Sequence, residues 1–569
     1  MLIIWLLIFF LILILILLLL NILVVRRGPT QLERSANMDE PHASPRHGKT
    51  LVIVALALIA AVCVGTFWFL NQPPTLPAAA AVVVPAAPPP PAVASAEQVH
   101  QFCGACHAYP PADTFPKAHW RKEIRTAYDF FRDSALQMPA PSMESVSLYY
   151  ENRAPLSLPP AKIEYAAAPP PVRLQPTGFR MKDQSPYPAV TNVSLGPLFD
   201  KEKRKLDIIV CDARLGQVLA LQSYATPPKW HVLGQMAAPC HAEVIDLDGD
   251  GINDVLVACL GSFPGTNAKV GSVVWLKGSK DGTFTPITLL ENVGRVADVQ
   301  AADFRKVGKT DLVVAVFGFH QTGAILYLEN HTTDWNHPVF VAKVLDDRPG
   351  SIHVCIGDID NDGRDDIVAL ISQEHETIVA FVNEGANGKD GCRFRKEVIY
   401  TAPHPAYGSS GIQLVDLNGD NKLDVLYTNG DILDPPYILK PYHGVQWLEN
   451  AGRFPFIHHP LTPMYGAMRA VAAEFRPGSG RKDIVAVSCL FPEVYPQRAK
   501  LNLGATVYLE QTAPGQFVRH SLEKITCDHF TCAAGDLDGS GQVQLVTGNF
   551  CWSKSHRIED SVVVWKSMK

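Results

Sequence analysis

Aspartate-rich loops recur at a near-constant interval through residues 172–569, and this repetition constrains the fold more than any other feature of the chain. Three copies are clear and four are weaker; in chain order they end at Asp207, Asp254, Asp311, Asp366, Asp424, Asp483 and Gln544. These ends lie 47, 57, 55, 58, 59 and 61 residues apart. Seven units of one period predict a closed or stacked repeat fold.

Strands of one kind follow most of these loops. Alternating segments with a large aromatic residue occupy 273–277, 325–330, 445–450, 506–510 and 562–566. Phe284, Phe454 and Phe517, each two residues after a glycine, indicate a further outer strand. Four short strands per unit are typical of a β-propeller blade, so we expect seven blades.

The last unit lacks an outer strand, because the chain stops at Lys569 soon after the segment 562–566. Residues Thr177–Phe179, near the start of the repeat region, resemble the missing strand. We therefore expect the first segment to complete the last blade and close the ring.

The loops and strands together resemble the FG-GAP/VCBS repeat family over residues 172–569, which implies an all-β propeller whose loops bind calcium. The spacing itself suits Ca²⁺, because carboxylates at loop positions 1, 3, 5 and 9 and the carbonyl at position 7 are hard oxygen ligands. We expect about three calcium ions of structural role. Their expected ligands are Asp246, Asp248, Asp250, Ile252, Asp254, Asp358, Asp360, Asp362, Arg364, Asp366, Asp416, Asn418, Asp420, Lys422 and Asp424.

The other four loops are degenerate. Arg305, Val307, Arg476, Ser540 and Gln542 stand where ligands belong. Little or no metal is expected in these loops.

A second motif lies outside the repeats. Cys103, Cys106 and His107 form a Cys-x-x-Cys-His sequence, the attachment pattern of a c-type haem. The two thiols would bond the haem covalently and His107 would ligate the iron. From composition alone, this motif is expected by chance about 0.01 times in such a chain. The alternative is half of a zinc site, but the sequence has no second Cys-x-x-Cys to complete a zinc site.

The motif lies in a segment, residues 95–153, that suits a small all-α class I cytochrome c-like domain with one haem c. Helices are expected at Ala96–Phe102, at His119–Gln137 and from Ser142 onward. In that family the sixth iron ligand is a methionine before the last helix, a place that Met138 holds. Met143 is the second choice, and His119 would give a bis-histidine iron.

The N-terminal region predicts export and anchoring. Residues 1–25 and 51–70 are apolar and long enough to span a bilayer. The arginines and the lysine of 26–50 place this loop in the cytoplasm, so the haem domain and the propeller are expected on the periplasmic side of the inner membrane. For residues 51–70, a cleaved signal peptide is the alternative to an anchor. For residues 1–37, the alternative is that they result from an upstream mis-start of translation.

Two Pro/Ala-rich linkers, 71–94 and 154–171, flank the haem domain. The formal net charge of −6 shows no basic excess, so nucleic acid is not an expected partner. Disulfides are permissible outside the cytoplasm, and Cys527 and Cys532 are the closest pair in the propeller, although both can equally be free core residues.

Polar residues that precede the metal loops indicate a lined central funnel, although the starts of strands are often polar without binding anything. They include Asp298 and Arg469. A long insert at 429–444 concentrates further charged groups. The candidate funnel residues are His241, His353, Asp431, Asp434, Lys440, His443 and His529.

The whole chain resembles membrane-anchored bacterial fusions of a monohaem c-type domain with an FG-GAP/VCBS propeller. This resemblance implies electron transfer to a redox partner protein outside the cytoplasm. Two alternatives stay open: a propeller that oxidises a small-molecule substrate, not identified by any motif, and passes electrons to the haem, and a calcium-dependent adhesion protein without haem.

Overall fold

The computed structural model describes residues 92–568, except for 135, 182–183, 201, 387–390 and 434. The predicted apolar segment, cytoplasmic loop and anchor at 1–25, 26–50 and 51–70 lie outside the described residues, as do Asp434 and most of the first linker. Within the described part, no helix is both long and apolar enough to cross a membrane.

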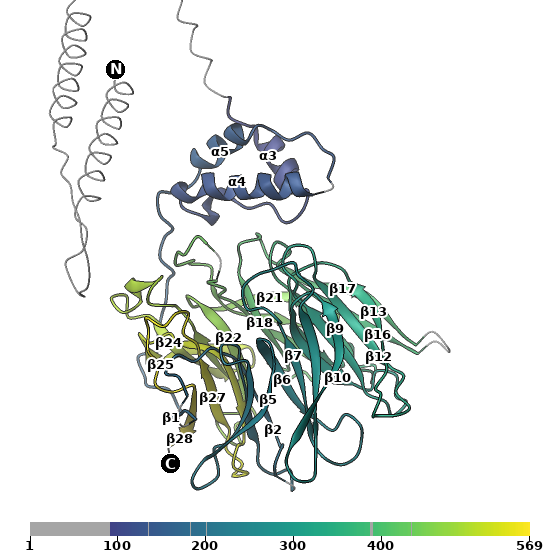
Figure 1. The fold of residues 1–569 in the computed structure, drawn as a ribbon. Coiled ribbons are helices and arrows are strands. Elements are labelled where there is room, and N and C mark those ends of the chain that lie inside the picture. Colours follow the sequence, from purple (N-terminus) through teal and green to yellow (C-terminus); the bar gives the residue numbers. More distant parts are fainter. Residues whose placement is uncertain are drawn as a thin grey trace, which may run out of the picture. The chain divides into compact units, whose positions relative to one another are not determined.

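The segment before the propeller is helical (Figure 1). It contains α3 (Ala96–Cys103), the 3-10 helix η1 (Ala112–Thr114), α4 (Lys117–Asp133) and α5 (Met143–Glu151). Ser95 caps α3 in a capping box with Gln98, and the Ser142 side chain accepts from the Ser145 N–H to cap α5, as the sequence predicts. Helix α4 ends four residues before the predicted Gln137, because Ser134 is extended.

Aromatic residues form the core of this helical segment. The indole of Trp120 stacks on Tyr150 with ring centroids 3.9 Å apart, and Phe115 packs edge-on against Trp120. Arg121 forms ion pairs with Glu144 and Glu151, which join α4 to α5 at the surface. Such exposed pairs orient the helices more than they stabilise them.

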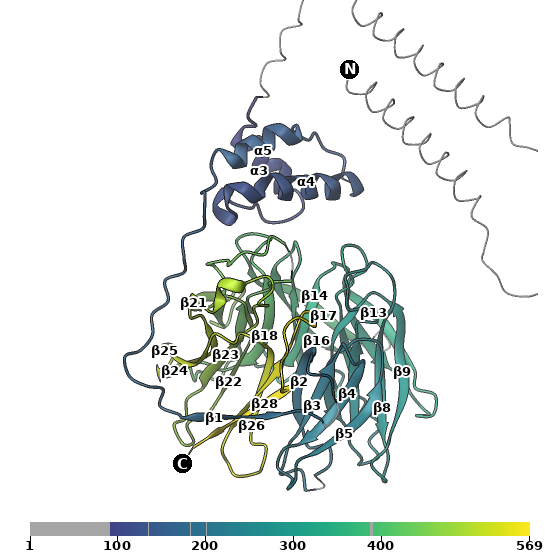
Figure 2. The ribbon, with the colours of Figure 1, turned by 60° about the vertical axis from the view of Figure 1, so that its left-hand side comes forward.

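Seven four-stranded antiparallel sheets follow, so the prediction of a seven-bladed propeller is confirmed (Figures 1 and 2). We number the blades along the chain. Blades 1 to 3 comprise β2 (Val190–Gly196), β3 (Asp207–Asp212), β4 (Gln217–Gln222), β5 (Lys229–Gln235); β6 (Pro239–Ile245), β7 (Asp254–Cys259), β8 (Gly271–Gly278), β9 (Phe284–Val293); and β10 (Val296–Ala302), β11 (Asp311–Val316), β12 (Ala324–Asn330), β13 (Phe340–Asp346).

Blades 4 to 6 comprise β14 (Ser351–Gly357), β15 (Asp366–Ile371), β16 (Thr377–Ala386), β17 (Cys392–Thr401); β18 (Ser409–Val415), β19 (Asp424–Asn429), β20 (Gly444–Glu449), β21 (Ile457–Pro463); and β22 (Ala467–Ala473), β23 (Asp483–Ser488), β24 (Gly504–Ala513), β25 (Gln516–Lys524). Blade 7 contains β26 (His529–Gly535), β27 (Gln544–Asn549) and β28 (Val562–Ser567). A 3-10 helix, η3 (Pro496–Arg498), lies in the insert of blade 6.

Blade 7 is closed by the start of the repeat region. Strand β1 (Leu174–Phe179) pairs with β28, with Thr177 opposite Val564. The outer strand of the last blade thus comes from the N-terminal end of the propeller, as predicted from Thr177–Phe179. Joining the two ends in one sheet leaves no unpaired strand edge at the closure point.

The second strand of every blade is buried along its whole length. Sequences such as Val255-Leu-Val-Ala-Cys259 pack against neighbouring blades on both faces, which explains their continuous apolar character. The first residue of each second strand is also the last residue of the preceding loop. Each loop is therefore anchored directly in the core.

The segment 154–171, predicted as a linker, lies along the outer strand of blade 6. The Ala161 N–H donates to the Tyr465 hydroxyl at 2.8 Å and the Ala166 N–H to the Arg519 carbonyl at 2.8 Å. The Arg519 guanidinium also lies 4.7 Å from the centre of the Tyr165 ring. This segment is therefore fixed to the propeller by hydrogen bonds despite its proline-rich composition.

Candidate functional site

The Cys-x-x-Cys-His motif begins at the last residue of α3. Cys103 is half-buried beneath the aromatic core, whereas Cys106 is exposed. The Nδ1 of His107 lies 2.8 Å from the Ala108 carbonyl oxygen, which can only accept a hydrogen bond, so the proton is on Nδ1. This tautomer presents the lone pair of Nε2 to a metal, as an iron-ligating histidine requires.

Tyr150 holds the motif against the core. Its hydroxyl donates to the Pro110 carbonyl at 3.1 Å and lies 3.8 Å from the Cys103 sulfur. Burial raises the pKa of the Cys103 thiol. Two thiols at this spacing, an oriented imidazole and an aromatic core fit the attachment of a haem c, for which Cys103 and Cys106 would be the covalent sites and His107 the iron ligand.

The predicted sixth ligand lies in the loop between α4 and α5. Met138 is half-buried, Met143 opens α5 with 40% of its surface exposed, and His119 is half-buried in the first turn of α4. The Tyr128 hydroxyl donates to the Pro141 carbonyl at 2.6 Å and ties this loop to α4. Met138 stays the predicted ligand because of its place in the loop.

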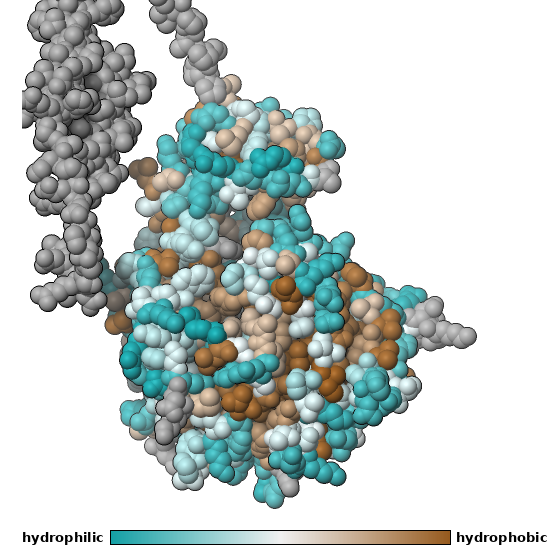
Figure 3. All heavy atoms as spheres, in the orientation of Figure 1, coloured by the Kyte–Doolittle hydropathy of each residue, from teal (hydrophilic) through white to brown (hydrophobic). Residues whose placement is uncertain are grey.

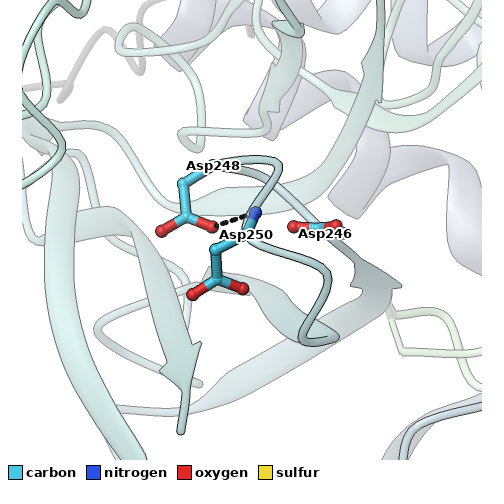
Figure 4. A group of neighbouring side chains, drawn as sticks. All are labelled: Asp246, Asp248 and Asp250. Carbon is cyan, nitrogen blue, oxygen red and sulfur yellow. Dashed lines mark hydrogen bonds between the residues drawn. The ribbon is translucent and has the colours of Figure 1, made fainter. Parts of the chain in front are cut away.

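Two of the three predicted calcium loops gather carboxylates closely. In blade 2, oxygens of Asp246, Asp248 and Asp250 lie within 4.8 Å of one another (Figure 4). In blade 4 the same holds for Asp358, Asp360 and Asp366. The blade 5 loop has Asn418 at position 3, between Asp416 and Asp420. Oxygen atoms at this spacing can surround one Ca²⁺ in each loop.

The carboxylate at position 9 also shapes the loop. Asp366 accepts hydrogen bonds from the N–H groups of Ile359, at 2.9 Å, and Asn383, at 2.7 Å. Asp254 and Asp424 accept from the equivalent N–H groups of blades 2 and 5. Burial is the main reason that the pKa of Asp366 and the pKa of Asp424 are each raised to about 6.

Position 7 is held by a backbone hydrogen bond within the loop, and its carbonyl stays a predicted calcium ligand. The N–H groups of Ile252, Arg364 and Lys422 each donate to the carboxylate at position 5 of the same loop, at 2.8–3.0 Å. Cationic side chains contact all three of these loops: Lys277 pairs with Asp248, Arg364 with Asp362 and Lys422 with Asp420.

Arginines fill the equivalent place in blades 3 and 6. The Arg305 guanidinium donates to both oxygens of Asp311, at 2.9 and 2.7 Å, and to Glu329 at 3.2 Å. Arg476 makes the same contacts with Asp483 and Glu510. The sequence indicated that these loops lack metal but not that a side chain supplies the cation; an arginine at loop position 3 is the signal.

Tyrosines accompany these arginines. The Tyr327 and Tyr508 hydroxyls each donate to the position 9 carboxylate, both at 2.6 Å. At the same place on the third strand, blades 2, 4 and 5 have Trp275, Ala380 and Trp447. Blades 3 and 6 therefore share one carboxylate–guanidinium–tyrosine arrangement that satisfies the buried Asp without an ion.

The predicted funnel residues His241 and His353 meet at Asp298. The Nδ1 of His241 lies 3.2 Å from Asp298 Oδ1, the Nε2 of His353 lies 3.8 Å from Oδ2, and the Arg469 guanidinium donates to His353 Nδ1 at 2.6 Å. In the register of each inner strand, a bulge precedes the position of these residues. They therefore lie at one level around the propeller axis.

Several side-chain hydrogen bonds of the inner strands join adjacent blades. The Val354 N–H donates to Asp298, the Ser194 hydroxyl to the Ala242 carbonyl and the Ala472 N–H to Gln413. Since neighbouring inner strands do not pair as sheets, these side chains link them. The polar ring is thus a structural belt, and burial lowers the pKa of His241 and His353, which keeps both neutral.

The other funnel candidates lie elsewhere. His529 is buried and contacts Asn549 and Glu523 at 2.6 and 2.7 Å. Lys440 and His443 are buried within the insert of blade 5 beside His404, a residue that no sequence pattern singled out. Asp431 accepts a hydrogen bond from the Leu433 N–H.

Among the described cysteines none forms a disulfide.

Comparison with known proteins identifies the repeats. Residues 246–314 and 358–427 match the FG-GAP-like repeat family. No curated protein matches the chain. The chain is similar to solved structures of the Bacillus licheniformis rhamnogalacturonan lyase PL11 (12% identity, 69% of this chain and 75% of that chain, TM-score 0.36) and the V. cholerae biofilm matrix protein Bap1 (10%, 70% and 91%, TM-score 0.37). These scores are too low to carry an argument about function. The chain contains FG-GAP-like repeats within a seven-bladed β-propeller.

Proposed function

We propose that this protein is a membrane-anchored, extracytoplasmic c-type cytochrome that transfers electrons, with a calcium-stabilised propeller that binds a partner. The observation that supports it most is the hydrogen bond of His107 Nδ1 to the Ala108 carbonyl, which leaves the Nε2 lone pair available to ligate iron. A haem bound there would supply reversible one-electron chemistry at the iron.

The residues of the helical segment have separable roles in this proposal. Cys103 and Cys106 fix the group covalently, and His107 orients it. Tyr150, only 1% exposed, keeps the Cys103 sulfur against the core and excludes water from that side. Met138 would complete the coordination and raise the potential relative to a bis-histidine iron.

The three predicted calcium ions support the propeller rather than the electron transfer. Each would neutralise carboxylates that converge in one loop and attach it to the second strand through the position 9 aspartate. Because blades 3 and 6 use Arg305 and Arg476 in the same place, the cation has a structural role in all these blades.

A redox titration of the full chain, produced in a host that attaches haem c and purified in detergent, tests the proposal. We expect one reversible one-electron wave per chain, lost in His107→Ala and shifted to lower potential in Met138→Ala, with Met143→Ala as the matched control. A wave unchanged by His107→Ala would contradict the assignment of the proximal ligand.

A further inference from the structure

One register position of the third strand is charged in most blades. In blade 2 it is Lys277, which directly follows Leu276, the residue that pairs with Val255 at the start of the second strand. The register of the other blades gives the equivalent residues. In blades 3 to 7 these are Glu329, Val382, Glu449, Glu510 and Lys566.

The charge at this position is opposite to that of loop position 3 wherever both residues are charged. The four pairs are Lys277 with Asp248, Arg305 with Glu329, Arg476 with Glu510 and Lys566 with Asp538. In blade 4 the position is occupied by Val382, which supplies no charge to the loop. The third strand therefore contributes to the electrostatics of the metal loop in the same blade.

In blade 2 this contribution falls on a predicted calcium ligand. Only 3% of the Asp248 side chain is exposed, and its Oδ2 accepts a hydrogen bond from the Lys277 ammonium group. The same ammonium group lies 5.1 Å from the centre of the Trp275 ring, a cation–π contact. Lys277 is thus held at the loop by two interactions.

The cations of the other two predicted calcium loops are more weakly placed. Arg364 and Lys422 occupy loop position 7 and pair with the position 5 aspartates, Asp362 and Asp420. The side chains of both pairs are 26–37% exposed. Water screens such pairs, and the cations can turn into solvent at little cost. The attraction between Lys277 and the buried Asp248 is less screened.

In blade 5 the third strand adds a negative charge instead. Glu449 Oε1 accepts a hydrogen bond from the Asn418 amide at 3.3 Å, and Asn418 Oδ1 accepts from the Asp420 N–H at 3.1 Å. Glu449 thereby keeps the oxygen of Asn418 directed to the loop, as an outer partner of a metal ligand does.

We propose that Lys277 competes with calcium for Asp248, so that the blade 2 loop binds the ion more weakly than the loops of blades 4 and 5. This inference rests on the proposed calcium sites. A divalent ion in blade 2 either displaces the ammonium group from Asp248 or shares the carboxylate with it, and both alternatives cost free energy. Without calcium, the same lysine partly neutralises the converging carboxylates of Asp246, Asp248 and Asp250.

Calcium titration of the full chain in detergent, after a chelator has removed bound metal, tests the competition by calorimetry. We expect the wild type to bind two ions tightly and a third more weakly. Lys277→Met, which keeps the apolar stem, is expected to raise the affinity of the weak site about tenfold. Lys566→Met, the same change at the same position of blade 7, is the matched control and is expected to leave all calcium affinities unchanged.

Thermal unfolding gives a second readout. In chelator, Lys277→Met is expected to unfold at a lower temperature than the wild type, because Asp248 loses its counter-charge. An equal excess of calcium is expected to raise the unfolding temperature of this variant more than that of the wild type or of Lys566→Met. Lys277→Gln, which also lacks the charge, is expected to behave in the same way.

The possible results separate this inference from the calcium sites on which it rests. Three bound ions whose affinities Lys277→Met and Lys277→Gln leave unchanged would overturn the competition and retain the sites. Two ions in the wild type and three in Lys277→Met would be the limiting case of the same competition and would support it. No calcium uptake by the wild type or the variants would overturn the sites and the competition together.

Discussion

Arg305 and Arg476 each place a guanidinium beside the buried aspartate of a loop, where blades 2, 4 and 5 have predicted calcium ligands. Each guanidinium forms two parallel hydrogen bonds to a fully buried aspartate and a third to a glutamate. Removal of one partner of such a pair leaves a charge in a low-dielectric site without compensation. Breaking one of these buried arginine–aspartate pairs should therefore lower the free energy of unfolding more than breaking an exposed ion pair on the blades.

Replacement of Arg305 by Met should destabilise the protein by roughly 3–5 kcal/mol, because the buried Asp311 loses its counter-ion. Urea unfolding at pH 7 measures the change. Arg393→Met, which breaks an exposed pair with Glu384, is the control and should cost less than about 1 kcal/mol. Equal effects of the two substitutions would refute the role assigned to Arg305.

Glu376 should make stability depend on pH. Its carboxyl is buried, and this burial raises its pKa from 4.5 to about 7. A raised folded pKa gives a stabilising contribution that is complete below the unfolded value and is lost as the pH rises through 7. Between pH 4.5 and pH 8 the loss should amount to roughly 3 kcal/mol.

Urea midpoints at several pH values, compared between the wild type and Glu376→Gln, isolate this effect. Gln does not titrate, so the difference between the two proteins should change steadily over this pH range. Parallel pH profiles would show that Glu376 titrates normally.

At the scale of the element, the blades differ in the loop between their first two strands. Blades 2 and 4 bring three carboxylates together, whereas blades 3 and 6 provide a guanidinium. The same strand order therefore accommodates a guanidinium beside the aspartate that begins the second strand in blades 3 and 6, and a predicted calcium ion in blades 2 and 4.

Calcium should raise stability by about 2.7 kcal/mol for each site when free Ca²⁺ is 100-fold above its dissociation constant. Asp358→Ala should reduce the bound calcium by one ion per chain in a metal analysis after dialysis. Asp303→Ala, the same position in the Arg305 loop, should leave the calcium content unchanged. If both variants lose an ion, the distinction between the two loop types is wrong.

At the closure of blade 7, Gly178 in β1 lies against the side chain of Asp560. A Cβ at this position would lie 1.9 Å from Oδ2 of Asp560. Gly178→Val should therefore destabilise the ring by about 1–3 kcal/mol through overpacking. Thr177→Val, an exposed change on the same strand, should stay within about 0.5 kcal/mol in the same thermal unfolding experiment; a similar loss in both would point to the strand as a whole rather than to Gly178.

The repeats made most of this architecture predictable. Seven loops at one period gave the blade number, and the unpaired end at 562–566 gave the closure by Thr177–Phe179, because strand pairing at the ends has few solutions. The ion pair of Arg305 with Asp311 was not predicted, although the arginine at loop position 3 was a signal of it, because the sequence does not show where the guanidinium points. His404 was missed because it contacts Tyr442 and His443 only through the fold.

At the scale of the whole molecule, the chain joins a small helical segment to a propeller. The described propeller is held by blade-to-blade packing and by the polar belt around Asp298, and the helical segment by an aromatic core around Trp120 and Tyr150. A domain with so small a core gains stability when a covalent group fills its centre, which is consistent with a haem at Cys103 and Cys106.

The absorption spectrum of the full chain after acid–acetone extraction tests the central claim most directly, with the protein produced in a host that attaches haem c. The account predicts sharp reduced bands that survive extraction and disappear in the Cys103→Ala, Cys106→Ala double variant. Extraction of all haem from the wild-type protein would contradict covalent attachment and leave a propeller with predicted calcium sites but no electron-transfer centre.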